Sequence, residues 1–268
     1  MKHMHIPIFL INLDRSKDRL AAVTASAHEY GLQITRIAAA DGRALDEQQL
    51  RTLDEPKFHE MCGKGVLLPE LGCYISHLQA LKQIAEGTAE MGVVLEDDVR
   101  FTPDFAPMLD RLSRVGGWDV VKLINHRTVG FVRHLKLTDT YSLGRCLHGS
   151  MGSAAAYVVR RDAARKLLVA MEKMSLPYDV ELERAWIHKV DFFTLDNAVV
   201  RILYAESTIA GIGAYKRMKF PFYRRWRTLI HRTVNYLQCV AYAVSSSRLH
   251  VVARTEQADE GAEAVNAA

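Results

Sequence analysis

The chain has 268 residues, of which 49% are hydrophobic and 25% are charged. This composition is ordinary for a globular protein and excludes a wholly disordered or fibrous chain. At roughly 100–200 residues per domain, the length predicts one large domain or two small ones. The four cysteines are scattered without a Cys-x-x-Cys pair, which argues against a disulfide scaffold or a cysteine zinc site and favours a reducing compartment.

The net charge of +4 is concentrated in one segment. Residues 215–232 contain seven Lys or Arg and no Asp or Glu. Because the whole chain has 35 basic and 31 acidic residues, the remainder carries 28 basic residues against 31 acidic ones. The positive charge is therefore a local feature. No apolar run reaches the roughly 18 residues of a membrane span, and the N-terminal apolar run ends in charged residues instead of a signal-peptide cleavage site.

Alternating strand and helix patterns predict an α/β domain. A continuous apolar run at Ile6–Leu13 predicts a central strand that is covered on both faces. A helix is expected over Ser16–Tyr30 and a second short strand over Gln33–Ile37. Strand, helix and strand in this order favour parallel pairing. Residues 43–68 are polar and irregular, which predicts a loop or short helices.

The alternation continues through the rest of the chain. Helices are expected over Pro69–Ala85, Asp162–Met174 and Asp179–His188. Strands are expected over Gly92–Leu95, Asp119–Ile124, Ser153–Val159, Phe192–Leu195 and Val199–Tyr204.

Three consecutive carboxylates, Glu96, Asp97 and Asp98, follow one of these strands. Carboxylates this close repel one another, and burying any of them is costly unless a cation is shared among them. Strand alternation would put Glu96 and Asp98 on one face and Asp97 on the other. Hard oxygen ligands at the carboxyl edge of a parallel sheet suit Mn²⁺ or Mg²⁺ bridging a diphosphate. A solvated acidic turn is the alternative.

Basic residues follow the first strand. Arg15 and Arg19 are i,i+4 neighbours at the start of the expected helix. Their charges oppose the helix dipole, and a bound phosphate would reverse that cost. Surface ion pairs with Asp14 and Asp18 explain the same pattern equally well. Asp41, after the second strand, could hydrogen-bond a ribose or simply begin an Asp-Gly turn.

Several short motifs follow one another in a fixed order along the chain. They are Ile11-Asn12-Leu13-Asp14-Arg15-Ser16-x-Asp18-Arg19, Ala40-Asp41-Gly42, Glu70-Leu71-Gly72-Cys73-x-x-Ser76-His77 and Leu95-Glu96-Asp97-Asp98. Later ones are Gly152-x-x-Ala155-Ala156-Tyr157, Ala163–Leu167, Pro177-x-Asp179 and Glu206-Ser207-Thr208. Their order over about residues 6–210 resembles glycosyltransferase family 25. Its bacterial members are lipooligosaccharide galactosyltransferases, and its animal relatives are collagen galactosyltransferases.

The resemblance implies a Rossmann-like α/β domain of the GT-A type, a divalent metal (Mn²⁺ or Mg²⁺) and a UDP-sugar donor. Asp98 is the predicted metal ligand, with Asp97 as the second candidate. The motif reads Glu-Asp-Asp instead of Asp-x-Asp, so the division between ribose and metal contacts stays open. The donor site would consist of Asn12, Arg15, Arg19, Asp41, Ser76, His77, Glu96 and Asp97. His77 is also compatible with a buried core histidine.

Inverting transfer from a UDP-α-sugar needs charge neutralisation at the leaving diphosphate and a base for the acceptor hydroxyl. Acids begin the helix expected over Asp179–His188. Asp179 and Glu183 are i,i+4 and would share a face with Trp186, on which a sugar ring could stack. We predict Asp179 as the base, with Glu183 beside it. Dipole complementation at a helix start explains the same acids without chemistry.

The basic segment also contains Phe220, Phe222, Tyr223 and Trp226. Basic residues interleaved with aromatic ones are typical of a surface that binds anionic lipids. Nucleic-acid backbones and a solvated helix packed through its aromatics are alternatives. A lipid-linked oligosaccharide acceptor favours the membrane, so we expect a peripheral protein on the inner face of the bacterial cytoplasmic membrane that binds no nucleic acid.

The sequence therefore predicts an inverting, metal-assisted galactosyltransferase that adds β-linked galactose to a terminal sugar of lipooligosaccharide or lipopolysaccharide. We expect a catalytic domain over 1–214, a basic aromatic extension over 215–250 and a disordered tail over 251–268. Another UDP-hexose or UDP-hexosamine donor on the same fold is the first alternative. A non-catalytic basic protein that binds membranes or nucleic acid is the second.

Overall fold

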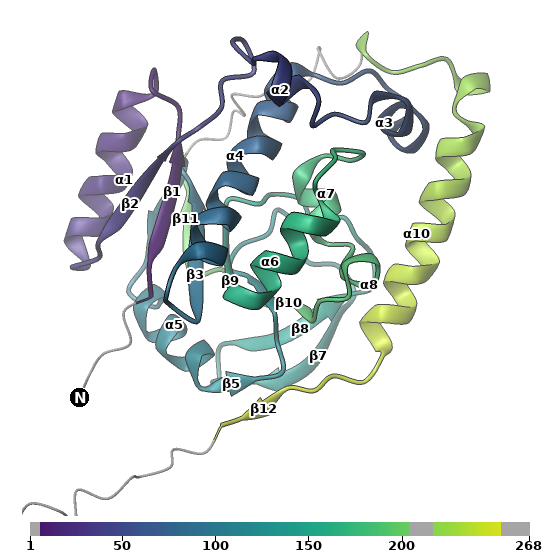
Figure 1. The fold of residues 1–268 in the computed structure, drawn as a ribbon. Coiled ribbons are helices and arrows are strands. Elements are labelled where there is room, and N and C mark those ends of the chain that lie inside the picture. The colour runs from purple at the N-terminus through teal and green to yellow at the C-terminus, as the bar shows by residue number, and fades with distance from the viewer. Residues whose placement is uncertain (1–5, 204–216, 253–268) are drawn as a thin grey trace, which may run out of the picture.

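A computed structural model describes residues 6–203 and 217–252, so the Glu206-Ser207-Thr208 motif and residues 253–268 of the expected tail lie outside the described residues. An eight-stranded mixed sheet forms the centre of the molecule (Figure 1), in the order β2-β1-β3-β9-β6-β10-β8-β7. The strands are β1 (Ile8–Asn12), β2 (Ile34–Ala38), β3 (Met91–Glu96), β6 (Val120–Lys122), β7 (Phe131–Lys136), β8 (Ser142–Cys146), β9 (Ala156–Arg160) and β10 (Phe192–Leu195). Two small sheets pair β4 (Val99–Phe101) with β11 (Val200–Ile202) and β5 (Val115–Gly116) with β12 (His250–Val251).

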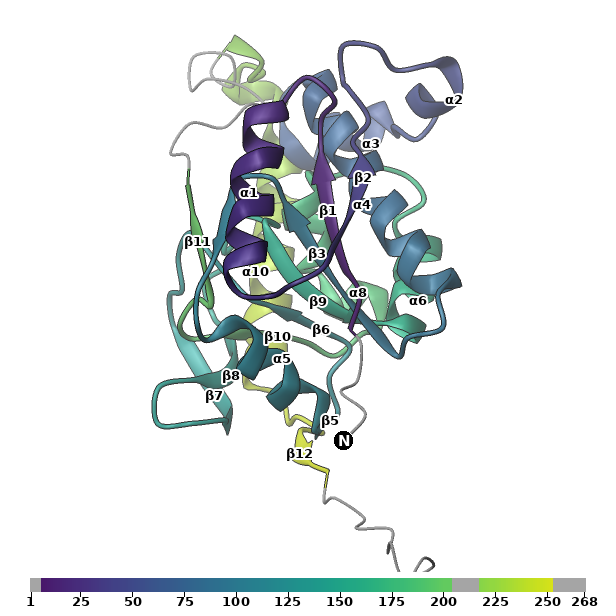
Figure 2. The same cartoon turned by 90° about the vertical axis from the view of Figure 1, so that its left-hand side faces the viewer.

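Helices cover both faces of the sheet (Figure 2). They are α1 (Lys17–Glu29), α2 (Glu47–Leu50), α3 (Glu55–Cys62), α4 (Leu68–Glu86), α5 (Phe105–Ser113), α6 (Arg161–Ala170), α7 (Tyr178–Leu182), α8 (Ala185–His188), the 3₁₀ turn η1 (Phe222–Arg224) and α10 (Trp226–Val244). The expected α/β fold class is confirmed.

The continuous apolar run of β1 is explained by two cores. Ile8 and Leu10 belong to the core beneath α1 and α5, whereas Phe9 and Ile11 belong to the core beneath α4 and α6. Alternate side chains of a strand point to opposite faces, so a strand covered on both sides has apolar residues at every position. β1 pairs in parallel with β2 and β3, as expected.

The second half of the sheet differs from the expectation of parallel strands. β9 runs antiparallel to both β3 and β6, and the β7–β8 hairpin adds two further antiparallel strands at the edge. The single helix expected over Asp179–His188 is wrong, because α7 ends at Leu182 and α8 begins at Ala185. Glu183, which lies between them, is fixed by a buried ion pair with Lys122.

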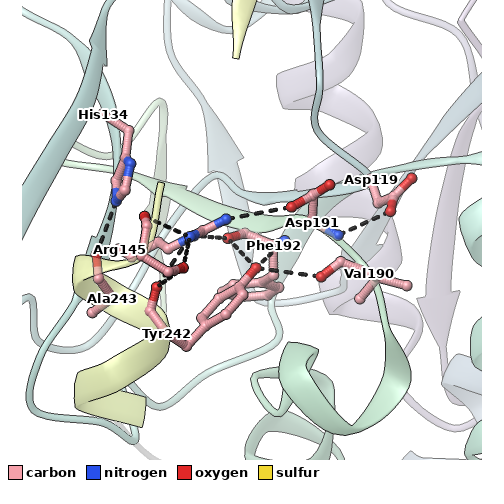
Figure 3. A network of polar contacts seen from close by, with 9 residues as sticks. Asp119, His134, Arg145, Val190, Asp191, Phe192, Tyr242 and Ala243 are labelled. Carbon is pink, nitrogen blue, oxygen red and sulfur yellow. Dashed lines mark hydrogen bonds and ion pairs between the residues drawn. The ribbon is translucent and has the colours of Figure 1, made fainter. Parts of the chain in front are cut away.

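The chain after residue 217 lies against the domain, since α10 contacts α3, α8 and β8, and β12 pairs with β5. Arg145 of β8 holds the carboxyl end of α10 (Figure 3). Its guanidinium donates hydrogen bonds to the Tyr242 carbonyl oxygen and to Ser245 Oγ, both at 3.0 Å, and lies 3.9 Å from the Tyr242 ring centroid. His134 Nε2 adds a 2.9 Å bond to the Ala243 carbonyl. A cation at a helix carboxyl end is favourable, so this contact fixes the orientation of α10.

Candidate active site

A cavity of about 390 Å³ opens where β1 and β3 end and where α4 and α7 begin. Small-molecule sites in α/β proteins are typically found at this edge of the sheet. The lining includes nine of the residues predicted from the sequence, namely Arg15, Arg19, Asp41, Ser76, His77, Glu96, Asp97, Asp98 and Asp179. The other two, Asn12 and Glu183, lie outside the lining.

Asp97 is held by two partners on the β1–α1 side of the cavity. Asn12 Nδ2 donates to Asp97 Oδ2 at 2.7 Å, and Arg19 Nη1 lies 3.1 Å from Asp97 Oδ1. Asn12 Oδ1 in turn accepts from Arg36 Nε at 2.9 Å. Asn12 is thus a buried support for Asp97, and both carboxylate oxygens of Asp97 already have partners within the protein.

Asp98 is in the opposite situation. Among the residues that the structure describes, its buried Oδ1 has no hydrogen-bond partner. Burial, followed by the neighbouring Glu96 and Asp97 carboxylates, raises the pKa of Asp98 to about 7. A buried, unpartnered carboxylate oxygen in an acidic cluster fits a bound hard cation, which would supply the missing partner and the missing charge.

Glu96 is oriented by a buried chain of side chains on the α4 side. His77 Nε2 lies 3.1 Å from Glu96 Oε1, and His77 Nδ1 lies 3.2 Å from the Tyr157 hydroxyl. That hydroxyl is 2.8 Å from the Tyr178 hydroxyl, and the Tyr178 ring stacks on His77 with centroids 4.0 Å apart. Burial raises the pKa of both tyrosines, so their hydroxyls stay protonated and available as donors. His77 is therefore both fully buried and part of the cavity wall.

Cys73 offers a second group of possible metal ligands together with His77 and Glu96. One ligand atom from each lies within 4.8 Å of the others. Burial raises the pKa of the Cys73 thiol, which keeps it protonated. A protonated thiol is a poor ligand for Mn²⁺ or Mg²⁺, which prefer oxygen. The oxygen cluster around Asp98 suits these ions better.

Close backbone contacts leave no room for a side chain at two motif positions, Gly42 and Gly72. A Cβ atom on Gly42 would lie 2.4 Å from the Leu68 carbonyl oxygen, and one on Gly72 would lie 2.5 Å from the Ala40 carbonyl oxygen. Ser76 Oγ fastens the same contact, because it accepts from the Ala40 amide at 2.9 Å and donates to the Gly72 carbonyl at 2.7 Å. The turn that carries Asp41 is therefore packed directly on α4, and Asp41 forms an ion pair with Arg15.

Asp179 lines the cavity from the first turn of α7. The N-cap of α7 is Pro177, and it makes no side-chain capping bond, so Asp179 is not the capping residue. Asp179 stands on a different element from the carboxylates that follow β3. The cavity is therefore lined by carboxylates from separate elements.

The expected face shared by Asp179, Glu183 and Trp186 is not formed. Glu183 accepts from Lys122 Nζ at 2.8 Å and from the Met151 amide at 2.9 Å. Trp186 packs near Tyr242, with ring centroids 5.7 Å apart, outside the cavity lining. The spacing assumed one continuous helix, and the break after Leu182 removes that geometry.

Sequence reasoning missed Lys122, His126, Ser153 and Tyr178. Three of them line the cavity, whereas Lys122 supports the loop before β9 by donating to the Gly152 carbonyl at 2.8 Å. Ser153 has a φ of 61°, a left-handed conformation that is uncommon for serine. One signal was present in the sequence: a lysine inside the apolar run Val120–Ile124 indicates a buried partner.

A cavity that joins clustered carboxylates to arginines at the carboxyl ends of parallel strands defines an α/β protein suited to an anionic ligand and a cation. Residues 5–182 match the family model for glycosyltransferase family 25 (LPS biosynthesis protein), and the chain belongs to this family. The resemblance seen in the motifs is thereby confirmed. A nucleotide-sugar donor is implied by the family.

Curated relatives match shorter segments. A glycosyltransferase 25 family member of Aedes aegypti is 34% identical over 122 residues, which cover 42% of this chain and 20% of that protein. Human procollagen galactosyltransferase 2 is 33% identical over 109 residues, 39% of this chain and 17% of that protein. The human inactive glycosyltransferase 25 family member 3 is 30% identical over 184 residues, 64% of this chain and 30% of that protein. The matched segments thus span less than a third of these relatives' length.

Among solved structures, a glycosyltransferase involved in the glycosylation of the major capsid of PBCV-1 aligns with 85% of this chain and 98% of its own. The TM-score is 0.44 and the sequence identity is 10%.

Proposed function

We propose that the chain is an inverting galactosyltransferase that transfers galactose from UDP-galactose to a terminal sugar of lipooligosaccharide or lipopolysaccharide, giving a β-linked product. The observation that carries the proposal is the buried Oδ1 of Asp98, which has no partner among the described residues and lies in the same cavity as Arg15 and Arg19. The names of the procollagen galactosyltransferases support galactose, and the description of the family supports the acceptor. Another UDP-hexose or UDP-hexosamine remains the alternative donor.

Asp98 and Glu96 are the residues that would hold Mn²⁺ or Mg²⁺. When bound, the ion supplies charge neutralisation for the leaving diphosphate. Of the two ligands predicted from the sequence, Asp98 keeps that role in the proposal. Asp97 becomes a positioning residue, because Asn12 and Arg19 already occupy both of its oxygens.

Arg15 and Arg19 stand at the start of α1, where guanidinium groups and helix amides favour phosphate. We assign them to the diphosphate and assign Asp41 to the ribose. Ser76 holds the turn of Asp41 in place, and His77 orients Glu96. Ser76 and His77 can therefore be required for donor binding without contacting the donor.

Asp179 is the proposed base. It accepts the proton of the acceptor hydroxyl as that oxygen attacks the anomeric carbon on the face opposite to the diphosphate. Glu183 is left out of the chemistry, because its carboxylate is committed to Lys122 and to the Met151 amide. A lipid-linked acceptor would place the protein at the inner face of the bacterial cytoplasmic membrane.

The test of donor and metal is thermal unfolding with a panel of UDP-sugars, with and without Mn²⁺. A ligand at about 100 times its Kd stabilises by about 2.7 kcal/mol, which shifts Tm by several degrees. We expect the largest shift with UDP-galactose plus Mn²⁺. Asp98→Asn should lose the part that depends on Mn²⁺, whereas Asp139→Asn, at a carboxylate that is 99% exposed, should keep it. No shift with any UDP-sugar would refute the proposal.

The test of the base is Asp179→Asn. We expect transfer to fall by about 10²–10⁴-fold, the usual contribution of a general base, while UDP and Mn²⁺ still stabilise the protein. Asp139→Asn again serves as the matched control. Turnover near that of the parent protein would remove Asp179 from the mechanism.

A further inference from the structure

Helix α10 packs one side against the domain and leaves its other side exposed. Its inner side makes a series of polar anchors at helical spacing, from Thr228 Oγ1 to the Glu60 carbonyl at 2.7 Å, from Arg184 Nε to Asn235 Oδ1 at 3.0 Å and from Cys239 Sγ to the Cys146 carbonyl at 3.4 Å. Together with the Arg145 contact, these bonds fix which side of α10 faces outward.

The outer side of α10 is an apolar stripe. Its large side chains are between 53% and 67% exposed, and they are Trp226, Leu229, Ile230, Leu237 and Val244. They follow the i, i+3/i+4, i+7 spacing of one helix face. At the amino end of the stripe, η1 adds Phe222 and Tyr223, which are 82% and 67% exposed. We call this surface, from Phe222 to Val244, the outer α10 face.

The charges that residues 217–252 contribute to the outer α10 face have one sign. Residues 217–252 contain no Asp or Glu, and Arg217, Arg224 and Arg232 are exposed there. Arg227 is also exposed and lies 3.4 Å from Glu60 of α3. An apolar stripe bordered by arginines matches the cross-section of an anionic bilayer surface, where acyl chains lie below negatively charged headgroups.

The outer α10 face is attached to the rim of the cavity. The Phe220 amide donates to the Gly63 carbonyl at 3.0 Å, and the Gly65 amide donates to the Met218 carbonyl at 2.9 Å. Residues 63–65 lead directly into α4, whose first turn lines the cavity through Pro69 and Glu70. In Figure 1 the amino end of α10 accordingly lies at the same end of the molecule as the start of α4.

We propose that the outer α10 face is a docking surface for an anionic phospholipid membrane, with α10 lying in the plane of the headgroups. Within residues 6–203 and 217–252, no helix has the length and apolar content to cross a bilayer, which leaves an interfacial position for α10. A second copy fits less well, because a two-fold contact would bring the arginines of the same segment together, and residues 217–252 offer them no carboxylate. A nucleic acid would use the arginines and leave the apolar stripe exposed.

The consequence for the proposed function is that an acceptor sugar on a lipid reaches the cavity while its lipid stays in the bilayer. Docking itself does not depend on that function and is measured without any sugar. Its failure would therefore leave the proposed transferase untouched, and failure of the UDP-sugar test would leave the docking surface untouched.

The experiment is co-sedimentation of the full chain with vesicles of phosphatidylglycerol and phosphatidylethanolamine, and with vesicles of phosphatidylcholine alone. We expect binding to the anionic vesicles that falls as salt rises, and little binding to the neutral ones. Leu229→Asn and Leu237→Asn should each lower the partition coefficient by about tenfold. Val169→Asn is the matched control, because Val169 on α6 is also exposed, at 81%, but lies away from α10.

A second pair of variants tests the charges. Arg224→Gln with Arg232→Gln should weaken binding to anionic vesicles and flatten its salt dependence, with no effect on neutral ones. All these side chains point outward, so the unfolding temperature should be unchanged. Equal recovery of the parent protein in the supernatant with and without anionic vesicles would overturn the proposal. So would a dimer that Leu237→Asn dissociates, or DNA binding that survives Leu229→Asn, in the absence of vesicle binding.

Discussion

Two buried groups of charges in this protein are built in opposite ways. Lys122 and Glu183, 1% and 9% exposed, satisfy each other at 2.8 Å, and backbone groups of the loop before β9 take their remaining bonds. The carboxylates after β3 gather like charges instead and leave an oxygen of Asp98 without a partner in the described residues. The difference separates charges that the protein balances internally from charges that it leaves unbalanced.

The largest expected effect comes from breaking the satisfied pair. Lys122→Met leaves Glu183 buried without its cation, which typically costs about 3–5 kcal/mol. Urea denaturation should show this loss in the free energy of unfolding. Replacing both residues, Lys122→Met with Glu183→Leu, should recover most of it, because no buried charge then remains. A loss below about 1 kcal/mol in the single variant would contradict a structural role for the pair.

The next effect concerns the contact that positions Asp41. Gly72→Ala forces a Cβ against the Ala40 carbonyl oxygen and should cost about 1–3 kcal/mol, with weaker donor binding because the turn is displaced. Gly65→Ala is the control, since its Cβ would meet the flexible end of Met218 instead of backbone. Chemical denaturation and UDP titration measure the two effects. Equal results for both variants would show that the close contact is not important.

Replacing Asp98, whose buried Oδ1 has no partner among the described residues, should raise the free energy of unfolding. Since the pKa of Asp98 is raised to about 7 in the folded state, that state retains a proton that the unfolded chain has already lost. Without metal, the free energy of unfolding should therefore fall as pH rises from about 4 to about 7. Asp98→Asn should remove this slope and stabilise the protein by about 1–3 kcal/mol at pH 8. An unchanged slope would show that the carboxylate is not strained.

The smallest change in stability is expected from Tyr157, whose hydroxyl belongs to the buried hydrogen-bond chain behind Glu96. Tyr157→Phe removes the hydroxyl that links His77 to Tyr178 and should cost about 1 kcal/mol. Mn²⁺ affinity should fall modestly, because His77 then orients Glu96 less firmly. Tyr223→Phe, at an exposed position, should change neither quantity. Isothermal titration with Mn²⁺ and thermal unfolding distinguish the two variants, and a result shared by both would argue against the buried chain of hydrogen bonds.

The sequence predicted those helices and strands whose apolar residues recur at regular helix or strand spacing. β1, α1, β2, α4 and β3 follow from apolar periodicity and lie close to their expected bounds. The β7–β8 hairpin was missed because β8 reads Ser-Leu-Gly-Arg-Cys, which has no strand pattern. Its Arg145 is accommodated by Phe193 and Tyr242, partners distant in sequence that no local rule provides.

In the candidate site, too, the sequence predicted which residues come together but not their contacts with distant residues. Motif order brought together nine residues that line one cavity, because each motif follows a strand or begins a helix at the same sheet edge. Glu183 was misplaced because helical spacing assumes an unbroken helix, whereas its carboxylate pairs with Lys122, 61 residues away in the sequence. The separate roles of Asp97 and Asp98 depend on Asn12 and Arg19, which adjacent positions in a sequence cannot reveal.

The clamp of Arg145 on the last turn of α10 has a practical consequence for anyone who shortens this protein. Deleting residues 226–252 to obtain a fragment that avoids lipid would remove the Tyr242 and Ser245 partners of Arg145 and the Cys239 contact of Cys146. A truncated fragment is therefore expected to misfold or aggregate. Point substitutions on the solvent side of the helix are the safer way to separate attachment from folding.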